Sequence, residues 1–413
     1  MTGGAFRERD DAGAALVVTG GAVLIDGRFT DATVAVMADG SIAAAARDAA
    51  ARDAGGPILD ATGLLVLPGI VDIHGDAFER QIMPRPGVDF PLDVALHETD
   101  RQVVANGITT VFHGVTWSWE PGLRGADNAR RLVAAIEDLR PGLAADTRLH
   151  LRHETFNLDA EAEIADWLAA RRIDILAFND HMTLTVEATG RAAKLARMVE
   201  RSGLSHEAFM QLVARVVARR HEVSGAIERL AGVALAHGVP LLSHDDTSPE
   251  QRAWYRALGC RVAEFPTTVE AAAEAAAHGD EIVFGAPNVV RGGSHTGWTS
   301  ATEMIRLGLC TVLASDYYHP APLLAAFRLD ASGTLPLAAA WSLIAEAPAR
   351  AAGLADRGRI AAGCRGDLVL IDRRHAAAPR VVATVVAGRV VHLAEPGRFR
   401  HAVASPHRIG TCA

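Results

Sequence analysis

The spacing of hydrophobic and polar positions changes twice along the chain. Residues 15–66 contain short apolar runs separated by turn signals such as Asp26-Gly27 and Asp39-Gly40, which predict a small antiparallel sheet. From Gly69 onward, apolar runs alternate with helical stretches, which is the pattern of a parallel sheet or barrel. After Arg359 the short-strand pattern returns. We therefore predict a small β-sandwich domain made of residues 1–66 and 359–413, with a barrel domain of residues 67–358 between its halves.

The middle of the chain contains eight candidate strands, which predict an α/β fold of the (β/α)8 TIM-like barrel type. Amphipathic helical patterns lie between most of them, for example at 128–139 and 300–307, and the second begins with the capping-box spacing Ser300 to Glu303. The interval 183–239 is too long for one crossover, so we expect an inserted helical pair that includes 205–237. The eight strands are predicted to end near His74, His113, Glu154, His181, His244, Thr268, Asn288 and Asp316.

Six of the predicted strand ends carry a residue that can bind a transition metal. His74 and Asp76 are two positions apart, so their side chains point to the same side of one strand. A lone His-x-Asp pair is common by chance, but the carboxyl ends of barrel strands converge on one mouth. His113 is kept outside the ligand set, as a structural histidine or a partner of a ligand. The predicted ligands are His74, Asp76, Glu154, His181, His244 and Asp316.

These imidazoles and carboxylates suit a hydrolytic site with two divalent metal ions, zinc being the first choice and manganese or iron the alternatives. Two neighbouring cations need a bridging anion, which many barrels supply as a carboxylated lysine. The one lysine of the chain, Lys194, lies in a helical pattern, so Glu154 is the predicted bridge. Asp316 is the predicted catalytic residue, which orients the attacking water and takes its proton. The alternatives for Asp316 are a purely metal-binding role and a helix cap.

Composition narrows the partners and the location. A net charge of -8 argues against a general nucleic-acid binder. The four cysteines have no C-x-x-C spacing, and no signal peptide or membrane span is recognisable. We expect a cytoplasmic protein without a nucleic-acid or membrane partner, and a homo-oligomer is compatible with the sequence.

Seven segments carry a resemblance to a known family, namely 69–76, 84–88, 243–250, 263–268, 285–295, 315–317 and 363–370. Together they resemble the amidohydrolase superfamily and, within it, the α-D-ribose 1-methylphosphonate 5-triphosphate diphosphatase family of phosphonate metabolism. The similarity covers residues 65–370. It implies hydrolysis of a sugar triphosphate to the 5-phosphate and pyrophosphate. The chain departs from the family pattern at Met182–Thr185 and at Tyr318–His319, where loops would contact substrate.

The residues themselves also favour a phosphorylated small-molecule substrate. Gly292 and Gly293 could turn their N–H groups inward as an anion nest beside Arg291, and Arg85 is held between two prolines. A plain flexible loop is the alternative for the two glycines. The predicted substrate-binding residues are Arg85, Arg291, Gly292, Gly293, Ser294 and His295.

Other functional classes are less well supported. The chain has no nucleotide P-loop motif and no G-x-S-x-G nucleophile elbow. A metal-dependent hydrolase of amides or cyclic amides is the runner-up, since that chemistry is common on this barrel. A homologue without catalytic activity is a third hypothesis, against which the full set of predicted ligands argues.

Overall fold

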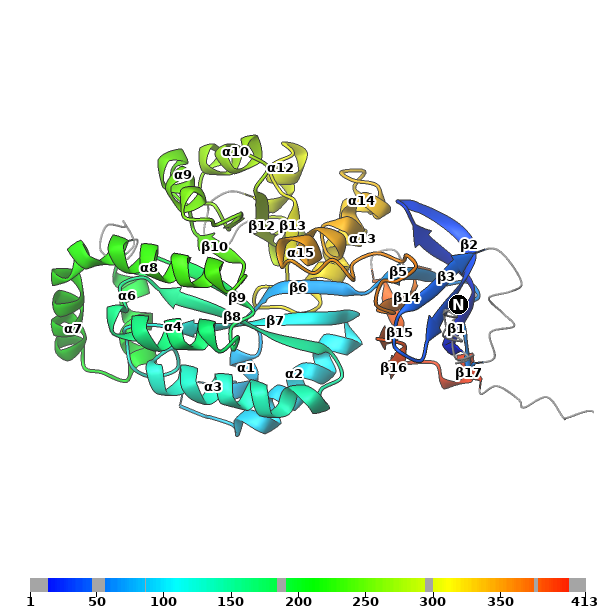
Figure 1. Cartoon of the computed structure of the whole chain (residues 1–413), viewed down its shortest axis with the longest axis horizontal. Helices are drawn as coiled ribbons and strands as arrows, with labels where there is room; N and C mark the ends of the chain where they lie inside the picture. Colours follow the sequence, from blue (N-terminus) through cyan, green and yellow to red (C-terminus); the bar gives the residue numbers. More distant parts are fainter. Residues whose placement is uncertain are drawn as a thin grey trace, which may run out of the picture.

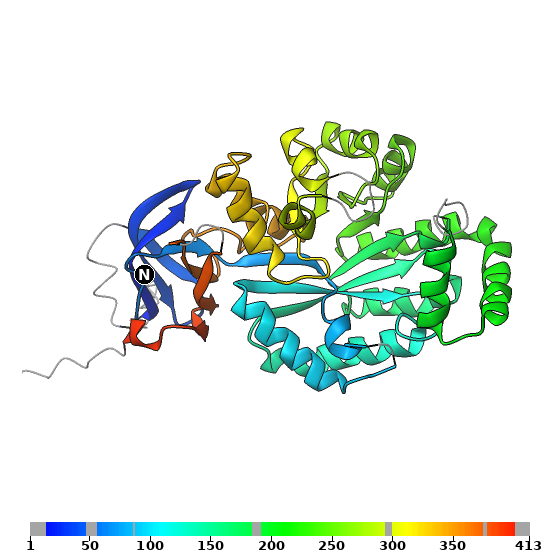
Figure 2. The same ribbon diagram turned by 180° about the vertical axis from the view of Figure 1, so that it is seen from behind.

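The molecule consists of a barrel from the middle of the chain and a second sheet from its two ends. The structure is a computed structural model, and it describes residues 14–46, 56–85, 87–183, 191–293, 300–374 and 378–400. The second sheet lies at one end of the long axis, and helices α6 (Arg191–Ser202) and α7 (His206–Ala218) lie at the other (Figures 1 and 2).

Eight parallel strands form the barrel, as predicted. Each strand pairs with the next along the chain, in the order β6 to β13. The first and last strands approach each other at their carboxyl ends, where the N–H of Asp316 donates to the carbonyl oxygen of His74 at 2.9 Å and the N–H of Asp76 donates to that of Asp316 at 3.0 Å. The barrel is therefore nearly closed. Its strands are β6 (Ile70–Gly75), β7 (Ile108–Trp117), β8 (Asp146–Glu154), β9 (Ile175–Asn179), β10 (Leu241–His244), β11 (Val262–Glu264), β12 (Glu281–Gly285) and β13 (Val312–Ala314).

Three predicted strand ends are wrong. Strand β7 continues past His113 to Trp117. Strand β11 ends at Glu264, and Thr268 instead caps the next helix, where its Oγ1 accepts from the N–H of Ala271. Strand β12 ends at Gly285, and Asn288 lies in a helix that follows at once with a proline in its first turn. A proline at the second helical position starts a helix readily, which apolar periodicity alone does not show.

Helices follow most of the barrel strands. The predicted insertion is present, with α7 and α8 (Val223–Ala236) as the expected pair and α6 as a further helix before them. The Ser205 hydroxyl caps α7 by accepting from the N–H of Ala208. The capping box at Ser300 is not formed, because the side chain of that residue makes no cap hydrogen bond. The remaining helices are α1 (Glu79–Ile82), α2 (Leu92–Ala105), α3 (Ala126–Leu139), α4 (Glu161–Ala169), α9 (Pro249–Ala257), α10 (Val269–Ala277), α11 (Ala286–Arg291), α12 (Ala301–Arg306), α13 (Ala321–Ala331), α14 (Leu337–Ser342) and α15 (Glu346–Ala351).

The small domain predicted from both chain ends is also present. Hydrogen bonds connect its nine strands into one sheet, in which β5 and β14 join the two ends of the chain. Side chains from both ends share one apolar core that includes Leu16, Val34, Leu370 and Val382. The strands are β1 (Ala14–Ile25), β2 (Arg28–Met37), β3 (Ile42–Ala46), β4 (Ile58–Asp60), β5 (Leu65–Pro68), β14 (Leu368–Asp372), β15 (Arg380–Val386), β16 (Arg389–Leu393) and β17 (Phe399–Arg400).

Gly69 connects the two parts of the molecule. It is the single residue between β5 of the small sheet and β6 of the barrel, and its N–H donates to the carbonyl oxygen of Asp367. A Cβ at this position would lie 2.8 Å from the Cβ of Thr109, so only glycine fits without a shift of strand β7. The small sheet is therefore attached directly to the strand that carries His74 and Asp76.

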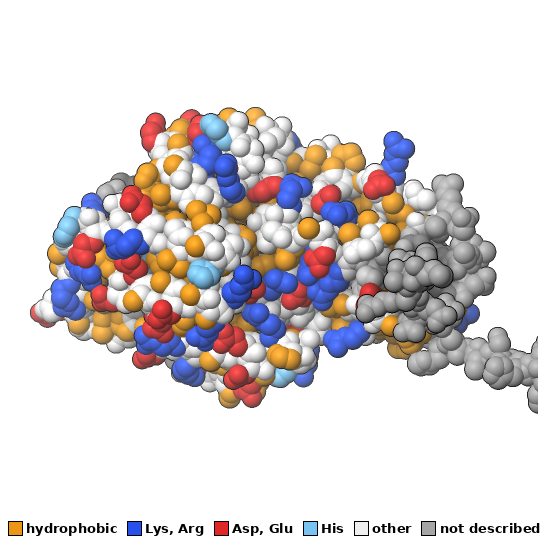
Figure 3. Space-filling view, viewed as in Figure 1, with side chains coloured by type: hydrophobic (Ala, Val, Ile, Leu, Met, Phe, Trp, Pro, Cys, Tyr) orange, Lys and Arg blue, Asp and Glu red, His pale blue; other side chains and the backbone are white. Residues whose placement is uncertain are grey.

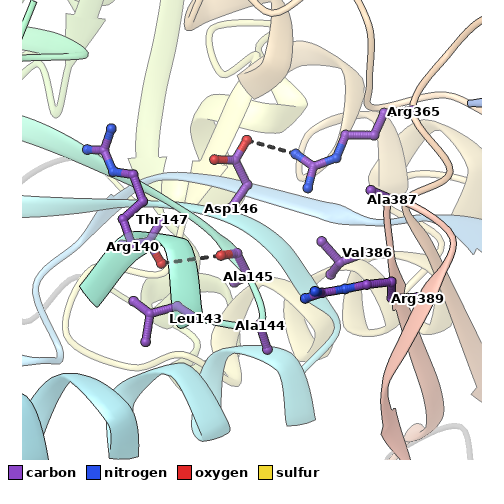
Figure 4. Close-up of a pocket in the computed structure, with 10 residues that line it drawn as sticks. All are labelled: Arg140, Leu143, Ala144, Ala145, Asp146, Thr147, Arg365, Val386, Ala387 and Arg389. Carbon is purple, nitrogen blue, oxygen red and sulfur yellow. Dashed lines mark hydrogen bonds and ion pairs between the residues drawn. The ribbon is translucent and has the colours of Figure 1, made fainter. Parts of the chain in front are cut away.

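Arginines and a carboxylate join the small domain to the start of the barrel strands. Asp146, the first residue of β8, accepts from Arg365 at 2.8 Å, from Arg148 at 3.1 Å and from Arg357. Burial favours the neutral carboxyl group, but these three arginines lower the pKa of Asp146 to about 2. A cavity of about 400 Å³ lies beside this cluster and is also lined by Arg140 and Arg389 (Figure 4). This contact lies at the amino ends of the barrel strands, opposite the predicted site. The exact domain boundaries stay a prediction.

The surface charge and the helix lengths relate to the predictions about nucleic-acid and membrane partners. Acidic and basic side chains are interspersed on the face shown in Figure 3. Within the described ranges, every helix is too short or too polar to cross a lipid bilayer. The cytoplasmic location and the lack of nucleic-acid partners stay predictions.

Candidate active site

His74, Asp76 and Asp316 meet where the first and last barrel strands join. One potential ligand atom from each lies within 4.8 Å of the others. The backbone hydrogen bonds across this junction hold Asp316 beside both His74 and Asp76. Asp72 adds a buried anchor, since its carboxylate accepts from the Ser315 hydroxyl at 2.5 Å and from the Ser315 N–H at 3.0 Å. Backbone pairing therefore brings Asp316 together with His74 and Asp76, which lie more than 200 positions earlier in the sequence.

A second group joins His74 to the far side of the barrel. Nδ1 of His74 lies 2.7 Å from Oε1 of Glu264, the last residue of β11, and both side chains are buried. His244 completes this group, in which the potential ligand atoms again lie within 4.8 Å of one another. If Nδ1 of His74 carries the proton, Glu264 fixes the tautomer that leaves Nε2 free to bind a metal. This arrangement is typical of metal-binding histidines.

The third group contains His181, His244 and Asp245. Nδ1 of His181 lies 2.6 Å from Oε1 of Glu154, and its Nε2 lies 3.5 Å from Oδ2 of Asp245. Nδ1 of His244 lies 3.2 Å from the same Asp245 oxygen. The six predicted ligands thus lie at one end of the barrel, and Glu154 contacts His181 there instead of belonging to one of the three groups. Their role as ligands stays a prediction.

One backbone conformation recurs one or two residues after three strands. Asp245, Phe265 and Asp316 have φ angles of 61°, 54° and 54°, in the left-handed region that non-glycine residues rarely adopt. Each of their N–H groups donates to the next strand, namely to the carbonyl oxygens of Glu264, Val283 and His74. Such conformations cost about 1–3 kcal/mol each and concentrate at functional sites.

The protonation of the site follows from burial and from its excess of carboxylates. Burial, followed by the repulsion of the Asp76 carboxylate, raises the pKa of Asp316 to about 8. Burial lowers the pKa of His74 well below its usual range, so this imidazole is neutral. Burial opposes charge on His181 as well, but Glu154 and Asp245 raise its pKa to about 9. In the absence of metal the site therefore holds protons where cations would be favourable.

Two buried atoms show that a cation fits the site. Nδ1 of His150 lies 2.8 Å from the carbonyl oxygen of Ile73, which can only accept, so Nδ1 carries the proton and Nε2 carries a lone pair. That lone pair faces Oε2 of Glu264 at 3.9 Å. Both atoms are buried and have no hydrogen-bond partner within the part of the chain that the structure describes. Two acceptors facing each other are stabilised by a cation between or beside them, so the donor set fits divalent metal binding.

Four residues of the site were not among the predicted ligands. Glu264 and Asp245 stand at strand ends and could have been found by extending the search to every carboxylate there. His150 and Arg152 lie inside strand β8 on the same side as Glu154. Period-two alternation counted back from Glu154 identifies both positions.

The predicted substrate-binding residues lie farther out. Arg85 is exposed. Arg291 is exposed as well, and its NH1 donates to the Tyr317 hydroxyl at 3.3 Å, next to Asp316. The predicted anion nest is wrong for this structure, because the N–H groups of Gly292 and Gly293 both donate to the carbonyl oxygen of Asn288 and so close helix α11. Ser294 and His295 lie outside the described residues.

The fold and the three donor groups are those of a metal-dependent hydrolase barrel. The chain belongs to the amidohydrolase family, since the model of that family matches residues 92–392. Hydrolysis is therefore the reaction class, and divalent metals are typical cofactors of the superfamily.

Two named proteins and a solved structure are similar to this chain. Alpha-D-ribose 1-methylphosphonate 5-triphosphate diphosphatase of Escherichia coli (strain K12) is 34% identical over 322 residues, which cover 76% of this chain and 85% of that protein. Adenine deaminase of Methylobacterium sp. (strain 4-46) is 27% identical over 385 residues, which cover 88% of this chain and 56% of that protein. The crystal structure of an amidohydrolase matches with a TM-score of 0.62 at 14% identity, over 92% of this chain and 99% of that one.

The metal-free protein should lose stability as the pH rises from 7.5 to 9. The folded state keeps protons on Asp316 and His181, with pKa values of about 8 and 9, while the unfolded chain has released both by pH 7.5. Each excess proton is worth up to about 1.4 kcal/mol per pH unit, so the free energy of unfolding should fall by roughly 1–3 kcal/mol. Urea unfolding of chelator-treated protein at several pH values measures this free energy. The Asp316→Asn variant should show a smaller fall, and an unchanged urea midpoint in the wild type would contradict the assignment.

Replacing Glu264 with Gln should lower the metal content. The substitution keeps the shape of the side chain but removes the negative charge that faces His74, His150 and His244. Glu154→Gln should also lower it if Glu154 is the bridge. Elemental analysis of the purified variants gives the stoichiometry, with Glu281→Gln at the opposite end of the barrel as the matched control. Full metal content in both site variants would remove these carboxylates from the metal centre.

Proposed function

We propose that this protein hydrolyses a phosphoanhydride bond of α-D-ribose 1-methylphosphonate 5-triphosphate or a related sugar triphosphate, and releases pyrophosphate and the 5-phosphate. The observation that carries the proposal is the 34% identity to the Escherichia coli diphosphatase over 85% of that protein. At this level of identity and coverage, substrate class is a better founded inference than it is from the fold, which hosts many reactions.

Arginines at the mouth support an anionic substrate. The guanidinium of Arg80 lies over the ring of Tyr317, 5.8 Å from its centroid, and Arg291 donates to the hydroxyl of the same residue. Both arginines are exposed and stand beside Asp316 at the rim. Guanidinium groups bind phosphate oxygens in a bidentate manner, so this rim suits the outer phosphates of a triphosphate.

The residues of the site have defined tasks in this reaction. His74, Asp76, His181, His244 and Asp316 would hold two divalent ions, for which zinc suits the imidazole-rich donor set best and manganese or iron are alternatives. When bound, the ions would polarise the attacking water and neutralise charge on the phosphoryl oxygens. Asp316 orients that water and takes its proton while the oxygen attacks phosphorus. The bond to pyrophosphate breaks, and pyrophosphate leaves with the electron pair.

A product assay tests the proposal against its runner-up. Purified protein with its metals intact is incubated with sugar triphosphates and, separately, with N-acyl compounds and ring amides. We expect inorganic pyrophosphate from the first set. A new carboxylate from the second set, without pyrophosphate from the first, would instead support amide hydrolysis. No turnover of either set by fully metallated protein would favour the homologue without activity.

Asp316→Asn should retain its metals and lose at least about 100-fold in kcat, the lower end for general acid–base catalysis. Asparagine keeps the size of the side chain and can still accept a hydrogen bond, but it cannot take up the proton of the water. The measurement is pyrophosphate release per metallated site. A fully metallated variant with near wild-type kcat would show that the base lies elsewhere, with Asp76 as the next candidate.

A further inference from the structure

Arg152 lies in the middle of the candidate site. It belongs to β8, points to the same side of the strand as His150 and Glu154, and is 5% exposed. Neighbouring strand β7 has Gly114 beside it, where a Cβ would lie 3.3 Å from Cδ of Arg152. The absence of a side chain at Gly114 leaves room for the arginine to reach the mouth. A buried arginine requires acceptors for its donors, because a guanidinium stays charged inside a protein.

Its guanidinium connects two of the three donor groups. NH1 lies 3.4 Å from Oδ2 of Asp76, and NH2 lies 3.3 Å from Nε2 of His244. Nε is buried and has no acceptor among the described residues. The arginine therefore occupies positions beside the very atoms that are offered to metals.

The contact with His244 cannot coexist with metal binding at the same nitrogen. A neutral imidazole has one lone pair, on the nitrogen without a proton, and Arg152 can only donate. If Nε2 of His244 binds a metal, NH2 of Arg152 loses its acceptor. An unsatisfied buried charged donor is costly, and a neighbouring dication increases the repulsion. An oxyanion that enters the site would accept the hydrogen bond from Arg152 and offset its repulsion from the dication.

We propose that Arg152 is a substrate-binding residue, which donates to a phosphoryl oxygen once its contact with His244 is given up. The inference rests on the proposed function and assigns Arg152 to the phosphate at the bottom of the site. The planar guanidinium matches a phosphoryl group better than an ammonium does. Arg80 and Arg291 bind nearer the rim, so Arg152 contacts the phosphate that lies closest to Asp76.

The test compares inorganic pyrophosphate binding by calorimetry in metal-loaded wild type, Arg152→Met and Arg152→Lys. The methionine variant removes the charge and the guanidinium but keeps a side chain as long as the arginine up to Nε. We expect its Kd for pyrophosphate to rise by about 10- to 100-fold with metal content unchanged, as for loss of a charge-assisted hydrogen bond. The lysine variant, which keeps the charge and is the safer one to fold, should bind with intermediate affinity. KM for the triphosphate should rise in the same order.

Arg148→Met is the matched control. Arg148 lies on the same strand and the same side, four residues earlier, and pairs with Asp146 at the opposite end of the barrel. Asp146 keeps Arg357 and Arg365 in this variant, so the fold should survive and pyrophosphate affinity should not change.

The outcomes separate this inference from the proposed function. If wild type releases pyrophosphate from triphosphates but Arg152→Met and Arg152→Lys bind pyrophosphate as tightly as wild type, only the role of Arg152 is overturned. The same holds if metal content and pyrophosphate affinity fall together, since Arg152 would then merely position Asp76 and His244. If wild type neither binds nor releases pyrophosphate, both proposals fail.

Discussion

The site depends on hydrogen bonds that continue the barrel beyond the ends of its strands. The N–H groups of Asp245, Phe265 and Asp316 each donate to the neighbouring strand, and each of these residues adopts a left-handed conformation to do so. At the junction of β6 and β13 this pairing holds Asp316 between the backbones of His74 and Asp76, and the buried Asp72–Ser315 contact secures it. Because the backbone fixes these positions, the side chains need little further ordering when a ligand binds. The strain of three left-handed residues is tolerated because the closed sheet determines the path of the chain around them.

The same closure concentrates negative charge. Asp76, Glu154, Asp245, Glu264 and Asp316 lie at one mouth, where Arg152 contacts Asp76 and protonated His181 contacts Glu154 and Asp245. Their mutual repulsion in a buried setting explains why Asp316 holds a proton at neutral pH in the metal-free protein. Divalent cations would relieve this repulsion, and the freed carboxylate of Asp316 could then accept a proton from water. Under the proposed function, metal binding would therefore also make the base available, since both depend on the same electrostatics.

The sequence predicts the architecture well because the periodicity of a barrel repeats at every strand. It locates the strand ends at His74, Glu154, His244 and Asp316 within two residues, since polar side chains follow apolar runs there. It fails at Thr268 and Asn288, where a short strand passes directly into a capped or proline-started helix. It also misses Glu264, which stands at a strand end but whose contact with His74, 190 positions away, is visible only in the structure. The anion nest fails for a related reason, because the N–H groups of Gly292 and Gly293 are already used by the end of their own helix.

The division between backbone-fixed ligands and loop residues also bears on substrate choice. The two departures from the family pattern follow strands β9 and β13. Met182 and Thr183 follow β9, Tyr318 and His319 follow β13, and Leu184 and Thr185 lie outside the described residues. In the second of them, Tyr318 is 45% exposed while His319 is 2% exposed, so one residue of the loop faces solvent and the next is packed into the protein. Burial lowers the pKa of His319 to about 4, although the nearby Asp76 carboxylate acts to raise it. His319 is therefore a neutral group close to the site. A neutral imidazole can donate to or accept from a substrate without adding charge. Under the proposed function, changes at Tyr318 and His319 would therefore alter which substrate fits without disturbing the backbone hydrogen bonds that hold the donor groups.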